Sequence, residues 1–185
     1  ISEDGKVVVY LTEGTLQRYD ADGSQILKKG VSNFSISKDG KKILFVDNEN
    51  NINLIQNGKT KKIVKDIRAF EYVSEDFETI YYTKDSTLYS KELGKDAKKI
   101  ASKVIMVLKV YDSGEVYYLK ENAEKILASK YVENDTKNTE LQKELKAHEI
   151  EAHTYELAYY NGKKNQSKLK TKIQIKHNLC CVCKI

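Results

Sequence analysis

The stretch Ser37-Lys38-Asp39-Gly40-Lys41-Lys42-Ile43-Leu44-Phe45-Val46 joins a tight-turn signal to a short apolar strand. Asp-Gly tolerates the positive φ of a tight hairpin, and Ile, Leu, Phe and Val suit a half-buried pleated surface. The same combination opens at Ser2-Glu3-Asp4-Gly5-Lys6, at Ser74-Glu75-Asp76 and at Tyr111-Asp112-Ser113-Gly114-Glu115. The strand aromatics Tyr10, Phe45, Tyr82 and Tyr118 follow one another at about 36 residues, a period that predicts a repeat architecture.

Each unit continues with further strand and turn signals. A second strand is centred on residues 16–19, 52–55 and 88–91, and a turn follows at Asp22-Gly23, Asn57-Gly58 and Gly94-Lys95. A Lys-rich strand and a last strand then lead to the next Asp-Gly turn. Four short antiparallel strands per unit are typical of a β-propeller blade. A β-sandwich or a repeating meander is the alternative.

Two propeller families share these motifs. The unit Ser-x-Asp-Gly-Lys with its Tyr-bearing strand resembles the TolB-type repeat, although Glu3, Lys38 and Glu75 stand where that motif usually has Pro. The Leu-Tyr, Gly-Lys and Lys-Ile-Ala endings are more closely similar to a propeller of bacterial surface proteins, which is described as similar to the YWTD propeller of low-density-lipoprotein receptors. The resemblance covers about residues 1–169. It implies an extracytoplasmic, cell-surface or membrane-anchored protein of a low-GC Gram-positive bacterium, and it implies no particular activity.

We therefore expect one all-β, propeller-like domain over residues 1–169. Its four blades are expected at about 1–36, 37–73, 74–110 and 111–169. The chain begins inside a blade motif, so an arc of a larger propeller is expected rather than a closed four-bladed ring.

The fourth unit contains an insertion. Leu16, Ile52 and Leu88 are 36 residues apart by subtraction, but the matching Leu157 follows Leu88 by 69. Within the insertion, about residues 133–152 read as an amphipathic helix, in which Thr139 and Gln142 could form a capping box and Leu141 and Leu145 share a face. The helix could lie across the propeller rim or bind a partner.

The last residues, 170–185, depart from the repeat. They hold all three cysteines, and the metal interpretation would use His177, Cys180, Cys181 and Cys183. Adjacent cysteines cannot easily splay around one tetrahedral ion, so reactive thiols or intermolecular disulfides are favoured over a zinc site. The net charge of +5 also belongs to this end of the chain: seven lysines follow Glu156, leaving 25 basic against 27 acidic residues before them.

Other motifs favour structure over chemistry. His148 and His153 in His-Glu-Ile-Glu-Ala-His are five residues apart, one more than a zinc-protease helix requires. The segments 20–24 and 47–51 lack the later glutamate of a calcium loop and fit hairpin turns. Neither a phosphate-binding Gly-rich loop nor a catalytic triad is evident. The sequence thus predicts no catalytic, cofactor-binding or metal site.

The expected function is a non-catalytic binding or interaction module without a cofactor. Its partner would be an unknown protein or a cell-wall glycan, and a membrane would be reached only through segments outside this chain. Arginine occurs only at positions 18 and 68, which argues against specific nucleic-acid recognition. The alternative is an accessory propeller of a peptidase or polysaccharide-degrading enzyme whose catalytic domain lies outside these residues.

Overall fold

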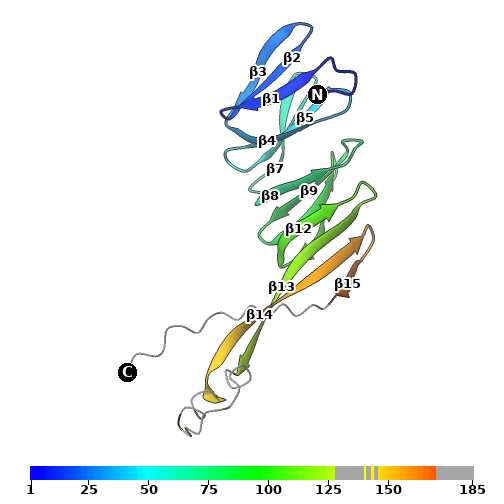
Figure 1. Ribbon diagram of the computed structural model, residues 1–185. Helices are drawn as coiled ribbons and strands as arrows, with labels where there is room; N and C mark the ends of the chain where they lie inside the picture. The colour runs from blue at the N-terminus through cyan, green and yellow to red at the C-terminus, as the bar shows by residue number, and fades with distance from the viewer. Residues whose placement is uncertain (128–139, 141–142, 144–145, 170–185) are drawn as a thin grey trace.

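The structure, a computed structural model, describes residues 1–127, 140, 143 and 146–169. Its strands form four antiparallel sheets, here named A to D, that follow one another in a row (Figure 1). Sheet A contains β1 (Val8–Thr12), β2 (Thr15–Asp20) and β3 (Gly23–Lys29). Sheet B contains β4 (Val31–Ile36), β5 (Lys42–Asp47), β6 (Ile52–Gln56) and β7 (Lys59–Val64). Sheet C contains β8 (Ala69–Val73), β9 (Thr79–Lys84), β10 (Thr87–Glu92) and β11 (Ala97–Ser102). Sheet D contains β12 (Val104–Val110), β13 (Glu115–Leu127), β14 (Glu149–Asn161) and β15 (Asn165–Leu169).

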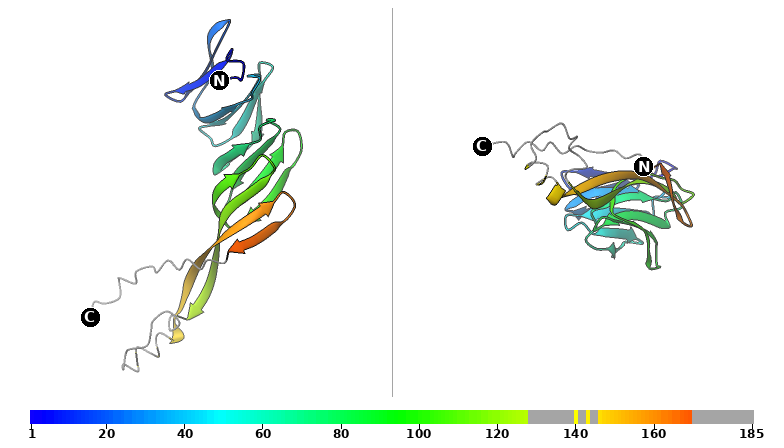
Figure 2. Two further views of the ribbon diagram at one scale, coloured as in Figure 1. Left: turned by 45° about the vertical axis from the view of Figure 1, so that its right-hand side comes forward. Right: turned by 90° about the horizontal axis from the view of Figure 1, so that it is seen from below.

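The predicted all-β, propeller-like architecture is confirmed. Sheets B, C and D have four strands in chain order, and sheet A has three. Figure 1 and the left view of Figure 2 place sheets A and D at opposite ends of the row, so the four sheets form an open arc and not a closed ring.

The phase of the repeat differs from the predicted one. The expected boundaries at 36/37, 73/74 and 110/111 fall inside sheets B, C and D, between the first two strands of each. The reason is that the Ser-x-Asp-Gly-Lys turn closes a hairpin within one sheet, and the amide of Ser37 donates to the carbonyl of Lys42 at 2.9 Å. Each of these sheets begins one strand earlier than expected.

Side-chain hydrogen bonds explain why the turn sequence recurs. The Ser37 hydroxyl donates to Asp39 at 2.6 Å and accepts from the Lys42 amide at 2.9 Å. Asp39 also accepts from the Lys41 amide at 3.0 Å, and these hydrogen bonds lower the pKa of its carboxyl. The Ser2–Asp4 and Ser74–Asp76 pairs repeat the arrangement, with the same lowering of the pKa of both aspartates.

The third turn contains an unusual residue. Phe77 occupies the position of Gly40, and its φ of +60° lies in the left-handed region that bulky residues rarely adopt. Its side chain is 3% exposed and belongs to the core between sheets B and C. We infer that burial of the ring offsets the backbone strain.

The cores lie between successive sheets. Leu16, Ile52 and Leu88, which are each 0% exposed, pack toward the next sheet in the A–B, B–C and C–D cores. Val9, Leu44 and Tyr81 on the neighbouring strands do the same, while Ile43 and Phe45 face the preceding sheet. The apolar residues that recur about every 36 positions in the sequence are therefore the residues that pack one sheet against the next.

In the fourth unit, the hairpin is much longer than in the others. Its strands pair from Glu115–Asn161 to Leu127–Glu149, whereas β12 pairs with β13 only as far as Lys120. Beyond that point, β13 and β14 form a two-stranded ribbon that projects from the row (Figure 1).

The inserted helix is only partly within the described residues. Glu140, Lys143, Lys146 and Ala147 have helical backbone conformation, but residues 149–152 belong to β14. The expected end of the helix at about 152 is therefore wrong, because pairing with residues 124–127 extends the strand there. No described helix is long or apolar enough to cross a membrane.

Candidate functional site

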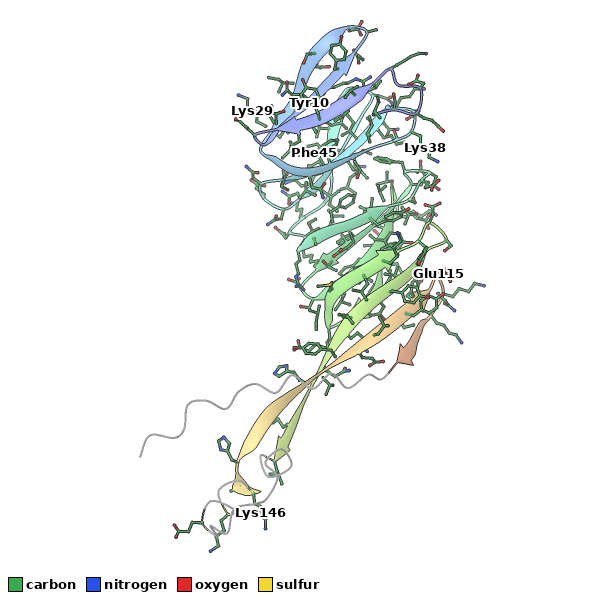
Figure 3. The ribbon with its side chains drawn as sticks, in the orientation of Figure 1. Tyr10, Lys29, Lys38, Phe45, Glu115 and Lys146 are labelled. Carbon is green, nitrogen blue, oxygen red and sulfur yellow. The ribbon has the colours of Figure 1, made fainter. Side chains whose placement is uncertain are left out.

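The row of sheets has two distinct edges. The turn edge carries the Ser-x-Asp-Gly-Lys hairpins, and the linker edge carries the connections between sheets at Gly30, residues 65–68 and Lys103. In Figure 3, Lys38 and Glu115 mark one side of the row and Lys29 marks the opposite side.

A groove of about 540 Å³ opens at the linker edge between sheets C and D. It is lined by Arg68, Ser86, Lys103, Val104, Ile105, Glu121, Ala123 and His153. The last three belong to the two-stranded ribbon, which forms one wall. Because β5–β6 and β9–β10 are joined by short turns, the equivalent wall does not exist at the linker edges of sheets B and C.

Backbone hydrogen bonds hold the floor of the groove in place. The amide of Val104 donates to Ser86 O at 2.8 Å, and the amide of Glu121 donates to Lys103 O at 2.9 Å. Lys103 and Ser86 both have a positive φ, of +59° and +53°. Gly30 and Gly14, at the linker edge between sheets A and B, share this backbone conformation. As glycines, they present no side chain there.

Arg68 and Lys103 give the groove its positive charge. Arg68 is exposed, and its guanidinium donates to Val104 O at 3.4 Å, which uses one of five N–H donors. Lys103 is also exposed. A guanidinium beside an ammonium group suits a carboxylate, which the planar fork of arginine can bind with two parallel hydrogen bonds.

The ribbon wall contributes a polar pair. His153 Nδ1 lies 2.7 Å from Glu121 Oε1, and both side chains are partly buried. The carboxylate of Glu121 is thereby engaged across the ribbon, so the groove lining holds two cations, Arg68 and Lys103, and one carboxylate that already has a partner. His153 Nε2 remains a potential hydrogen-bond donor or acceptor for a ligand.

Glu71 lies on β8, close in sequence to Arg68. Burial raises the pKa of the Glu71 carboxyl, while the hydroxyl of Thr83, which donates at 2.9 Å, and the charge of Arg68 act in the opposite direction. Glu71 thus draws part of its stabilisation from the same guanidinium that faces the groove.

A further groove opens at the linker edge between sheets A and B, at Lys29 and Gly30, apart from the linker-edge groove of sheets C and D. Two others, at the turn edge, are inter-sheet spaces. One lies between sheets A and B at Arg18, Asp20 and Lys41, and the other lies between sheets C and D at Lys98 and Tyr160. In the first, Arg18 is already paired with Asp20 at 2.6 Å. The linker-edge groove differs because it depends on the ribbon, a feature of the fourth unit.

The acidic turn segments and the histidines of the His-Glu-Ile-Glu-Ala-His motif lie in turns and on or beside β14, respectively. Asp20 and Asp47 cap hairpin turns, accepting from the amides of Asp22 and Glu49 at 3.0 Å, so the turn interpretation is confirmed. His153 lies on β14, and His148 lies just before that strand begins. No cluster of three or more His, Cys, Asp or Glu suited to a metal occurs among the described residues. The four candidate ligands of the tail lie outside them.

No pattern in the sequence predicts the groove itself. Arg68, Lys103 and Glu121 form no motif, because they come from two linkers and a strand far apart in the chain. The available signal is that Arg68 is one of only two arginines and lies between two strand patterns.

Comparison with known proteins supports the fold. No protein-family description matches the sequence, and no curated protein matches it significantly. Among solved structures, the tricorn protease is similar with a TM-score of 0.55 and 10% identity, over 90% of this chain and 16% of that one. The dipeptidyl peptidase 4 of Porphyromonas gingivalis is similar with a TM-score of 0.50 and 12% identity, over 91% of this chain and 32% of that one. At these identities the likeness shows a propeller-like fold alone. This chain spans less than a third of the length of either protein.

Proposed function

We propose that this chain is a non-catalytic binding module whose linker-edge groove takes a carboxylate group of a partner peptide. The observation that carries the proposal is that Arg68, Lys103 and the His153–Glu121 pair line one groove. The two cations attract and orient a carboxylate, and the His153 ring offers a second polar contact.

The experiment is calorimetric titration of the protein with a short peptide that has a free C-terminal carboxylate, compared with the same peptide amidated. We expect binding by the free acid and at least about tenfold weaker binding by the amide, since hydrogen bonds to a charged group contribute about 1.5–3 kcal/mol. Arg68→Ala should abolish the difference. Arg18→Ala is the matched control, because Arg18 is paired with Asp20 outside the groove. Equal binding of acid and amide would contradict the proposal.

We further propose an extracytoplasmic location on a bacterial cell surface, through segments outside these residues. The resemblance of the Ser-x-Asp-Gly-Lys units and the Lys-Ile-Ala endings to surface-protein propellers supports this. Treatment of intact cells with a protease tests it: loss of the chain from intact cells is expected, and protection until the cells are lysed would contradict it.

A second candidate is an accessory propeller of a peptidase. It is favoured by the structural similarity to the tricorn protease and to dipeptidyl peptidase 4. In that case the groove would hold the carboxyl end of a substrate for a catalytic domain elsewhere in the protein. Peptidase activity of the full-length protein that falls on Arg68→Ala substitution would support this candidate over a stand-alone binding module.

A further inference from the structure

The outer face of sheet D repeats the residues that the other sheets use to pack against their successors. Leu16, Ile52 and Leu88 are fully buried against the next sheet, and Leu157 is the fourth member of this series. It lies on the side of sheet D opposite to the C–D core, which contains Ala158 and Tyr160 from the same strand. Leu157 is only partly buried.

The neighbouring strands extend the same pattern. Tyr117 and Leu119 on β13 correspond to Leu44 and Val46 on β5, which are 0% and 6% exposed in the B–C core. On β12, Met106 pairs with Leu119 and therefore shares its face, and it is 54% exposed. The outer face of sheet D thus has the composition of an inter-sheet core without a described sheet against it.

The outer face of sheet A has the complementary composition. Val8 and Tyr10 correspond to Ile43 and Phe45, the residues with which sheet B meets sheet A. Tyr10 pairs with Gln17, which pairs with Ile26, and Val8 pairs with Tyr19, so all share one face. Ile26 and Tyr19 are 58% and 56% exposed.

We propose that the outer face of sheet D docks against the outer face of sheet A of a second copy of this chain. The contact would continue the A–B, B–C and C–D interfaces by one more step of the same repeat. It goes beyond the proposed function, because the residues that would make the contact, among them Leu157, Met106 and Glu115, do not line the linker-edge groove.

Charge complementarity supports this pairing. Lys42 of sheet B forms an ion pair with Glu78 of sheet C across the turn edge. By the repeat, Glu115 of sheet D corresponds to Lys42, and Lys6 of sheet A corresponds to Glu78. Docking of D on A would therefore place Glu115 opposite Lys6 of the second copy. This ion pair would resemble Lys42–Glu78, but with the acidic and basic residues exchanged between the two sheets. Glu115 accepts a hydrogen bond from Tyr159, which holds it at the edge of this face.

A head-to-tail contact of this kind is heterologous, so it closes into a ring or grows into a filament. Two copies would supply twice four sheets, a number within the range of about four to eight blades that propellers adopt. We therefore expect a closed pair of copies.

The experiment is light scattering on the purified chain across a micromolar concentration series. Twice the mass of one chain is expected for the unaltered protein, and the mass of one chain for Leu157→Lys. Glu115→Lys alone and Lys6→Glu alone should each raise the dissociation constant roughly tenfold or more, because like charges then face each other. The double variant Glu115→Lys with Lys6→Glu should restore association. Lys59→Glu, an exposed charge reversal on sheet B, is the matched control and should change nothing.

Circular dichroism of every variant separates loss of association from loss of folding. A single-chain mass at every concentration would overturn the proposal, as would a dimer that the double variant fails to restore or that Leu157→Lys leaves intact. None of these results bears on peptide binding in the groove, which is measured separately.

Discussion

The turn edge and the linker edge share a repeated backbone, but only the turn edge repeats its side chains. At the turn edge, Ser2, Ser37 and Ser74 make the same hydrogen bonds in three successive turns. At the linker edge, Gly30, Asp66 and Lys103 share a positive φ and a place in the chain but no chemistry. The difference teaches that the turn edge specifies the fold, whereas the linker edge can vary its side chains without disturbing the sheets.

The largest expected effect comes from the turn edge at Phe77. Phe77→Ala should lower the free energy of unfolding by about 3–5 kcal/mol, because it removes a buried ring from the B–C core. Urea denaturation measures the change. Arg68→Ala at the linker edge serves as the contrast and should cost about 1 kcal/mol or less, because Arg68 is exposed and supplies only part of the stabilisation of Glu71. If both variants lost the same free energy of unfolding, the turn edge would be no more important for the fold than the linker edge.

A smaller loss is expected for the repeated serine. Ser37→Ala should cost about 1–2 kcal/mol, because the partly buried Lys42 amide loses its acceptor and Asp39 loses a donor. Ser113→Ala in the fourth hairpin should cost less than about 0.5 kcal/mol, since its hydroxyl is exposed and bonds only weakly to Glu115. Chemical denaturation of both variants checks this prediction, and a larger loss for Ser113→Ala would contradict it.

At the linker edge, a substitution should change binding and leave stability intact. Lys103→Asp introduces a residue that tolerates the positive φ of this position, as Asp66 does at the equivalent position between sheets B and C. Binding of a free-carboxylate peptide should weaken by about tenfold or more, since a carboxylate then faces a carboxylate. The unfolding midpoint should not move. A parallel loss of stability would mean that Lys103 supports the fold and not a ligand.

The turn edge also predicts a response to acid. The pKa of Asp4, Asp39 and Asp76 is lowered in the folded state by hydrogen bonds from the turn. Such groups contribute stability above their unfolded pKa of about 3.9, and this contribution is lost as pH falls through the lower folded value. Thermal unfolding between neutral pH and pH of about 3 should show the loss, and Asp39→Asn should make the decline shallower. An unchanged slope would contradict the assignment.

Much of the fold can be predicted from particular residues. Four sheets and most strand positions can be predicted from the turn signal before each apolar, aromatic-bearing strand, which is Ser-x-Asp in the first three units and Ser113-Gly114 in the fourth. The phase of the sheets cannot be predicted this way, because a turn motif does not say whether it joins strands within a sheet or between sheets. The end of the helix fails for a related reason: residues 149–152 satisfy a helical pattern, yet pairing with β13 decides their conformation.

The groove cannot be predicted from the sequence, because the residues that line it are far apart along the chain and come together only in the folded structure. Arg68 precedes β8, Lys103 precedes β12, and His153 reaches them only because the fourth hairpin continues past Lys120. A pattern search within one repeat unit does not combine these residues.

The ribbon that forms the wall of the groove has a consequence for hydrogen exchange. From Asn122 to Leu127, β13 is bonded to β14 alone, and a two-stranded ribbon has little stability by itself. Its amides should therefore exchange with solvent through local opening, while those of Leu44 and Ile80 should wait for global unfolding. A ligand that bridges Arg68 and His153 would tie the ribbon to the linkers. Slowed exchange of these few amides would then report occupancy of the groove directly, without any change in the rest of the molecule.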